Sequence, residues 1–205
     1  MPKVAEKYKE ERRAHILKSA KALFAKNGFH KTTMRDIQKQ SGLSSGAVYG
    51  YFKSKEDIIE AIAMQTIQQN VATIKSSETR PDFASKLGAL GDHFFGAVES
   101  SRKNFISVDI ELWGEAQRNR KVKKILAQSM MAHLDAFCAL IEKARVKGEV
   151  RASVDSEYAA AAMIGVMHGL MVQMKIRQDV SVKRYSDVIR KMFDQYFFER
   201  GKQEP

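Results

Sequence analysis

The chain of 205 residues carries a formal net charge of +11 and 44% hydrophobic residues, so it can bury a sizeable core as one domain or two small ones. Its single cysteine, Cys138, excludes an internal disulfide framework and favours a reducing, cytoplasmic location. Helical periods run almost continuously and strand-like alternation does not occur, so we expect an all-α fold. The charged N-terminal residues lack the apolar run of a secretory signal.

The positive charge is concentrated near the N-terminus. Residues 1–55 contain 13 Lys and Arg against 4 Asp and Glu, a net charge of +9, whereas the remaining residues contain 22 and 20, a net charge of +2. This asymmetry is typical of a polyanion-binding head on a nearly neutral body. A basic terminus that only aids solubility would be the ordinary explanation of charge alone, but a recognisable motif lies in the same residues.

The first part of that motif is marked by a helix stop and a helix cap. Residues 7–27 predict a first helix with one apolar face, and Gly28 ends it. A second helix is expected after Thr33, which is a good N-cap with Asp36 at the capping-box position. Gly42 supplies the left-handed residue that ends this helix.

A second cap follows within a few residues. Ser44 can cap a short helix that runs to Tyr51, and Ser54 with Asp57 three residues later predicts the start of a longer helix. A cap, a helix, a glycine turn and another cap in this order are typical of a helix-turn-helix. The second helix of the motif is small at its start, where it could approach base edges in a major groove.

The same residues resemble the DNA-binding head of TetR-type transcriptional regulators. Two runs carry the resemblance, G-F-x-x-T-T-x-x-D-I at 28–37 and S-G-L-S-x-G-x-V-Y-x-Y-F-x-S-K-E at 41–56. The resemblance implies a three-helix helix-turn-helix head over residues 1–54. It further implies a helical ligand-binding and dimerisation body over residues 55–205, with about nine helices in all. The implied partners are a double-stranded DNA operator, a small-molecule effector and a second copy of the chain.

DNA contacts are expected from the two capped helices and from the start of the next helix. Ser44 and Ser45 offer hydroxyl and N–H groups to phosphate, and Gly46 allows the backbone to come close. Gly50 departs from the larger residue of many relatives, so the operator sequence cannot be transferred. With those implied by the resemblance, the expected DNA-binding residues are Thr33, Arg35, Ser44, Ser45, Gly46, Tyr49, Tyr51 and Lys55.

Six further helices are expected in the body. They cover residues 55–76, 82–100, 104–116, 119–147, a helix capped by Asp155 that contains the uncharged run 158–174, and 181–200.

The uncharged run 158–174 approaches the length of a membrane span, but its polar and small residues favour a helix buried between protein surfaces. We expect it to form a dimer interface with the last helix. An intrachain core is the alternative.

Aromatic and methionine side chains on the body helices are expected to surround a pocket for an apolar or amphipathic effector. Ordinary core packing is the alternative for each of them, and Met130 in particular is expected on the inner side of its helix. The expected ligand-binding residues are Phe94, Phe95, Phe105, Asp109, Trp113, Met130, Phe137, Met167 and Met171.

Motifs for catalysis do not stand out in the sequence. A phosphate-binding glycine loop, an HExxH pair and a nucleophile elbow are absent. His93, His133 and His168 fall on separate predicted helices and could converge on a metal, but partly buried, satisfied histidines are more common. We therefore expect neither an enzyme nor a metal or cofactor. The expected function is a repressor released from its operator by an effector, and the alternative is a helical small-molecule carrier or sensor without sequence-specific DNA binding.

Overall fold

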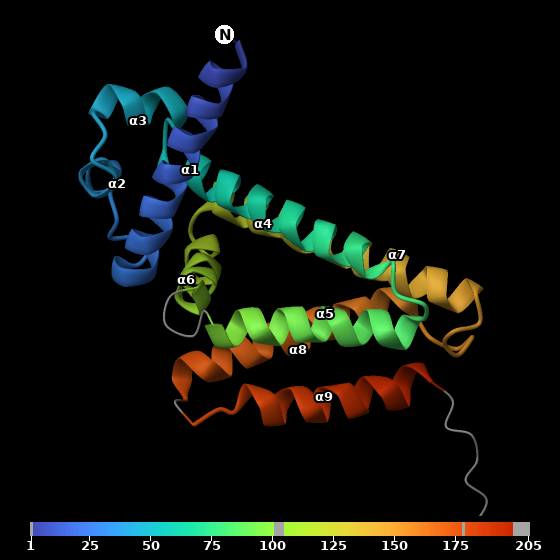
Figure 1. The fold of residues 1–205 in the computed structure, drawn as a ribbon. Helices are drawn as coiled ribbons and strands as arrows, with labels where there is room; N and C mark the ends of the chain where they lie inside the picture. Colours follow the sequence, from blue (N-terminus) through green and yellow to red (C-terminus); the bar gives the residue numbers. More distant parts are fainter. Residues whose placement is uncertain (1, 101–104, 178, 199–205) are drawn as a thin grey trace, which may run out of the picture. The chain divides into compact units, whose positions relative to one another are not determined.

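The computed structural model describes residues 2–100, 105–177 and 179–198, apart from the side chains of residues 2–5, 105–109 and 111. These residues form nine α-helices and no strand, which confirms the predicted all-α fold (Figure 1). The helices are α1 (Pro2–Asn27), α2 (Met34–Ser41), α3 (Ser45–Tyr51), α4 (Lys55–Ser77), α5 (Phe83–Ser100), α6 (Phe105–Ala116), α7 (Arg120–Val146), α8 (Ser156–Ile176) and α9 (Val182–Phe197).

Most helix boundaries lie at the predicted caps, and two differ from the prediction. The helix α1 begins at Pro2, earlier than residue 7, because the prediction followed apolar periodicity while the charged residues before it are themselves good helix formers. The helix α9 ends at Phe197, since Phe198 is extended with φ −108° and ψ 141°. The predicted continuation to Arg200 lies outside the described residues.

Contacts divide the chain into two compact units. The first unit contains Met1–Thr66 and Lys103–Ser129, and the second contains Ile67–Arg102 and Met130–Pro205. The first unit thus includes the start of α4, all of α6 and the start of α7 in addition to α1–α3. We expect a different division by function, into a DNA-binding head of residues 1–54 and a body of residues 55–205. That division stays a prediction.

The core of the first unit joins α1 to α2, α3 and α6. Phe24 is fully buried and its ring lies 5.2 Å from the buried Phe29 ring. His15 Nε2 lies 2.9 Å from the carbonyl oxygen of Ser41, which ties α1 to the last residue of α2. The core cluster confirms the predicted apolar face of α1. Its buried members include Ile16, Leu17, Ala20, Ile37, Val48, Phe52, Ile58, Ile59, Leu112 and Val122.

In the second unit α9 packs against α5 and α8. The Phe83 and Phe197 rings meet edge to face at 5.1 Å in the core. The Tyr185 hydroxyl of α9 donates to the carbonyl oxygen of Val166 in α8 at 3.3 Å, and a Cβ at Gly169 would lie 3.8 Å from that hydroxyl. A Cβ at Gly169 would therefore make only an ordinary van der Waals contact, and this contact between α8 and α9 does not require glycine at that position.

Two helices, α7 and α8, are long and apolar enough to cross a membrane by length and composition alone. Core helices of soluble proteins pass the same test, so this is a weak indication. The buried residues of α8 include Ala159, Ala160 and Ile164, which belong to the core cluster of the second unit. This part of α8 is packed against protein, as the sequence predicts.

Candidate nucleic-acid interface

Local hydrogen bonds shape the helix α2 and the turn after it. The Thr33 Oγ1 accepts the N–H of Asp36 at 3.2 Å, and Asp36 Oδ2 accepts the hydroxyl and the N–H of Thr33 at 2.6 and 2.8 Å. The Thr33 hydroxyl, and then its backbone N–H, lower the pKa of Asp36. Gly42 ends α2 with φ 66°, and Ser44 Oγ caps α3 by accepting the N–H of Ala47 at 3.3 Å. Both predicted caps of the helix-turn-helix are confirmed.

The helix α3 has one buried core residue and an exposed face. Val48 is fully buried, whereas Ser45, Gly46 and Tyr49 are exposed. A Cβ added at Gly46 or Gly50 would meet no atom within 4 Å. Small residues and one 46% exposed tyrosine therefore leave this face free for close approach of a large partner.

The other predicted contacts differ in their accessibility. Thr33 and Arg35 are exposed at the start of α2, although the hydroxyl and the backbone N–H of Thr33 already take part in the cap. Tyr51 is half-buried against the core of the first unit. Less of its side chain is therefore accessible to DNA than its predicted role suggests. A hollow of about 650 Å³ lies beside Arg35 and is lined by Arg35, Asp36, Gln38, Lys39, Gly42 and Leu43.

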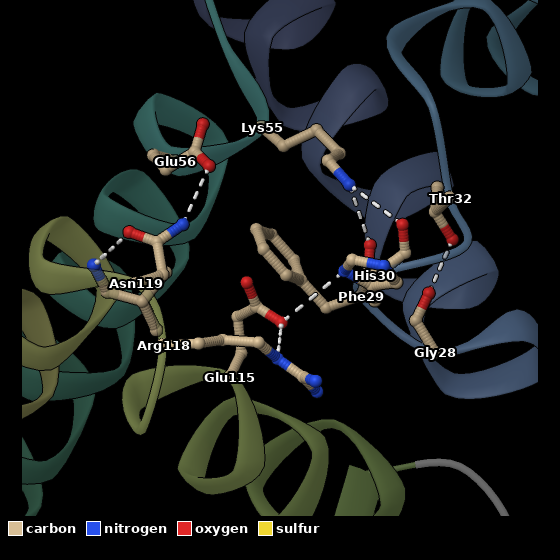
Figure 2. A network of polar contacts seen from close by, with 10 residues as sticks. Gly28, Phe29, His30, Thr32, Lys55, Glu56, Glu115, Arg118 and Asn119 are labelled. Atoms are coloured by element: carbon tan, nitrogen blue, oxygen red, sulfur yellow. Dashed lines mark hydrogen bonds and ion pairs between the residues drawn. The ribbon is translucent and has the colours of Figure 1, made fainter.

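Lys55 lies within a set of intramolecular contacts (Figure 2). Its Nζ donates to the carbonyl oxygen of Phe29 at 2.8 Å and to that of His30 at 3.3 Å. It also lies 4.6 Å from the centroid of the Phe29 ring. The sequence does not reveal these partners, because they lie 25 and 26 residues away and become neighbours only through packing.

Three residues around the end of α6 complete this network and were not singled out as functional from the sequence. Glu115 Oε2 accepts a hydrogen bond from Arg118 Nε at 3.1 Å and lies 3.8 Å from His30 Nδ1. Asn119 Nδ2 donates to Glu56 Oε1 at 3.0 Å. Figure 2 shows Glu115 directed toward His30, Asn119 directed toward Glu56 at the start of α4, and Arg118 directed toward Glu115.

The predicted ligand-binding residues lie in both units. On α5, Phe94 and Phe95 are half-buried with ring centroids 5.3 Å apart, and Trp113 is half-buried on α6 in the first unit. Phe137 and Met171 are buried and Met167 is half-buried, all in the second unit. The side chains of Phe105 and Asp109 lie outside the described residues.

The prediction that Met130 lies on the inner side of α7 is wrong, because its side chain is 47% exposed. Met130 follows Val122, Ile125 and Leu126, which pack in the core of the first unit, and precedes Leu134, which packs in that of the second. Neither core cluster includes it. Its place in a ligand pocket stays a prediction.

Two histidines of the second unit are half-buried. Asn70 Nδ2 lies 2.8 Å from His133 Nε2, which joins α4 to α7. Burial lowers the pKa of both His133 and His168, and the proximity of His168 lowers that of His133 further. His93 is exposed on α5. Among the described residues, no group of three His, Cys, Asp or Glu side chains is placed to hold a metal ion.

The chain matches two protein-family models. Residues 16–62, which hold the second part of α1, all of α2 and α3 and the start of α4, match the model of bacterial regulatory proteins of the tetR family. Residues 84–197, more than half of the chain, match the C-terminal model of BetI-type transcriptional repressors. The chain belongs to the TetR family. The predicted resemblance is thereby confirmed, and it extends beyond the head into the body.

This TetR-family chain is similar to several known members. It is 28% identical over 148 residues to the uncharacterized HTH-type transcriptional regulator YfiR of Bacillus subtilis, with 72% of each chain covered. The structure of Salmonella enterica GusR has a TM-score of 0.76 at 25% identity and covers 90% of this chain and 94% of GusR. FadR from Bacillus subtilis, in complex with stearoyl-CoA, has a TM-score of 0.78 at 20% identity over 89% and 97%.

These similarities confirm the expected helix-turn-helix head with a helical body. They also confirm the expected function at the level of the family, a ligand-responsive DNA-binding transcriptional regulator. The alternative of a carrier without sequence-specific DNA binding is not favoured. YfiR and the similar UidR of Escherichia coli are both HTH-type transcriptional regulators.

Proposed function

We propose that this TetR-family regulator is a cytoplasmic, homodimeric repressor whose two heads bind successive major grooves of an operator. The observation that carries the DNA-binding part is the exposed face of α3. Ser45, Gly46 and Tyr49 are exposed there, no other side chain lies within 4 Å of a Cβ at Gly46, and Val48 holds the helix in the core. The net charge of +9 in residues 1–55 adds attraction to phosphate. The proposal includes no catalytic step, cofactor, metal or membrane span.

The contacts divide by chemistry. Gly46 and the adjacent Ala47 would face base edges, where an alanine can meet a thymine methyl group. The hydroxyl groups of Ser44 and Tyr49 and the guanidinium of Arg35 would bind phosphate and fix the register of the head. The proposed DNA-binding residues, other than Lys55, are Thr33, Arg35, Ser44, Ser45, Gly46, Tyr49 and Tyr51.

A selected duplex tests this assignment. Genomic fragments bound by the full chain provide the duplex, and fluorescence anisotropy measures its affinity against a random duplex over a range of salt concentrations. We expect Tyr49→Ala to weaken binding to the selected duplex without changing the oligomeric state. Tyr49→Phe is the matched control that removes only the hydroxyl. Unchanged affinity in Tyr49→Ala would contradict the assignment of α3, and the absence of any preference for the selected duplex would favour the carrier.

Apolar side chains on α8 and α9 support the homodimer. Val188, Met192 and Tyr196 recur every four residues on α9 and are 57%, 57% and 43% exposed, and Tyr158 on α8 is 74% exposed. A row of exposed apolar side chains at helical spacing fits the same row on a second copy in a twofold interface. Two heads brought together in this way would meet half-sites about 34–36 Å apart, or a multiple of that distance.

A charge in this row tests the dimer. We expect Met192→Glu to have the mass of a 23.2 kDa monomer in light scattering while the wild type has twice that mass. Lys191→Glu, at an exposed neighbouring position on a different side of α9, is the matched control and should stay dimeric. A wild-type monomer, or a dimer that survives Met192→Glu, would contradict this interface.

The effector is proposed to be an apolar or amphipathic molecule bound in the body. The proposed pocket residues are aromatic or methionine side chains, apart from Asp109, and the similar FadR structure contains stearoyl-CoA, an amphipathic molecule. Trp113 is the single tryptophan, so its fluorescence can be followed directly during titration with stearoyl-CoA. We expect a saturable change with stearoyl-CoA and none with coenzyme A alone. A response to neither would exclude long-chain acyl thioesters as the ligand class. The proposed pocket residues are Phe94, Phe95, Phe105, Asp109, Trp113, Met130, Phe137, Met167 and Met171.

A further inference from the structure

Lys55 makes three contacts with the turn that follows α1. Its ammonium donates to the carbonyl oxygens of Phe29 and His30 at 2.8 and 3.3 Å and lies 4.6 Å from the centroid of the Phe29 ring (Figure 2). The Phe29 side chain is 2% exposed, so one wall of this site is rigid core. An ammonium has three protons to donate, and two carbonyls with an aromatic face use most of its capacity.

The position of Lys55 in its helix explains why these contacts are favourable. Lys55 is the first residue of α4, where the positive end of the helix dipole disfavours a cation. The carbonyls of Phe29 and His30 lie just beyond the C-terminal end of α1, where negative partial charge gathers. A movement of this ammonium away from the turn, toward a DNA phosphate, would break both hydrogen bonds and leave these carbonyls to find other donors.

The turn held by Lys55 also brings His30 to the end of α6. His30 Nδ1 lies 3.8 Å from Glu115 Oε2, which also accepts the hydrogen bond from Arg118. The Glu115 side chain is only 8% exposed, whereas that of His30 is 73% exposed. Because the Glu115 carboxylate has little contact with water, it depends on polar partners. Of its two described partners, Arg118 and His30, the second belongs to the head.

The same turn leads directly into the helix-turn-helix. Thr32 is fully buried, and its hydroxyl donates to the carbonyl oxygen of Gly28 at 2.7 Å. The next residue, Thr33, is the N-cap of α2. A displacement of residues 28–32 would therefore move the start of α2, and α3 follows α2 through the three residues Gly42, Leu43 and Ser44.

We propose that Lys55 is a positioning residue for operator binding and not a phosphate contact: it holds the turn of residues 28–32 so that His30 meets Glu115 and the end of α6 supports the binding orientation of α2 and α3. The inference rests on the proposed DNA binding and reassigns one residue of the expected interface. It adds Glu115 and His30, which contact no DNA in this proposal, to the residues that determine operator affinity.

The salt dependence of binding to the selected duplex separates the two roles of Lys55. Loss of one phosphate contact reduces the slope of log K against log salt concentration by about 0.9. We expect Lys55→Met to lower affinity roughly two- to thirtyfold with an unchanged slope. Lys55→Arg should restore affinity, because a guanidinium can donate to both carbonyls. Lys26→Met removes the same charge from an exposed position of α1 and is the control for net charge.

A double-mutant cycle with Glu115→Gln tests the link to α6. All affinities are measured with the full chain well below the melting temperatures of the variants, so that lost stability alone leaves affinity unchanged. We expect Lys55→Met to cost less affinity in the Glu115→Gln background than in the wild type.

Three results would overturn the proposal. A slope reduced by about 0.9 would indicate a phosphate contact. Lower melting temperature with wild-type affinity would indicate a purely structural role. Additive effects in the cycle would exclude the link through Glu115. Failure of the wild type to prefer the selected duplex is a separate result that contradicts the proposed function before any variant is tested.

Discussion

Asn119 holds the first turn of α4 through Glu56 while it caps α7. Its Nδ2 donates to Glu56 Oε1 at 3.0 Å, and its Oδ1 accepts the N–H groups of Lys121 and Val122 at 3.1 and 3.2 Å. Beside this contact, Lys121 Nζ lies 2.5 Å from Asp57 Oδ1. The starts of α4 and α7 are therefore joined by two polar contacts within the first unit.

Substitutions of Asn119 separate its two tasks. We expect Asn119→Ala to lower the free energy of unfolding by about 0.5–2 kcal/mol in urea denaturation, since the cap is lost. Asn119→Asp keeps the cap but places a carboxylate against Glu56, so it should also be less stable. Adding Glu56→Gln should restore stability to Asn119→Asp, because the amide can donate to the new carboxylate. Wild-type stability in Asn119→Asp would contradict the importance of the Glu56 contact.

Thr33 is both a proposed DNA contact and a structural cap, and its substitutions should show the second role without DNA. We expect Thr33→Ala to reduce the free energy of unfolding by about 1 kcal/mol, because Asp36 loses its partner at the start of α2. Thr33→Ser keeps the hydroxyl and should be nearly as stable as the wild type. Urea denaturation followed by circular dichroism measures both. Equal stability of the two variants would show that the cap contributes little.

The space around Gly46 predicts an effect on DNA binding without a cost in stability. A Cβ at Gly46 would meet no protein atom within 4 Å, so we expect Gly46→Ala to fold with unchanged or higher stability. Its affinity for the selected duplex should fall, because the methyl group occupies the face proposed to approach the bases. Gly96→Ala, at an exposed and equally open helical position of α5, is the control and should keep full affinity. Equal affinities of the two variants would argue against close approach at Gly46.

Glu142 predicts a loss of stability in acid. Hydrogen bonds from Arg145, and then from Ser156, lower the pKa of Glu142 from 4.5 to about 2. Because the pKa is lower in the folded state, the stabilisation is complete above pH 4.5 and disappears as the pH falls toward 2. Thermal melts should show a difference between wild type and Glu142→Gln at neutral pH that shrinks in acid.

A control for this prediction is Glu10→Gln, which removes an exposed carboxylate from α1. Its melting temperature should follow that of the wild type at every pH. If Glu142→Gln loses stability in acid as steeply as the wild type does, other carboxylates account for the acid sensitivity.

The sequence by itself determined the helices and most of their ends, because caps and turns depend on neighbouring residues. Thr33 and Asp36 are three residues apart, and their reciprocal hydrogen bonds follow from that spacing. Gly42 and Gly148 take positive φ values of 66° and 70° at helix ends where a side chain would be strained. The residue types of the turn and of α3 also sufficed to indicate the TetR family.

The tertiary structure alone decided which polar groups meet and which apolar side chains are covered. The partners of Lys55 lie 25 and 26 residues away, and Asn119 meets a carboxylate 63 residues away, so no local spacing indicates either pair. Met130 has the helical period of a core residue, but it is exposed and belongs to neither core cluster. Local hydrogen bonds are encoded by sequence separation, whereas contacts between distant segments depend on how whole helices pack.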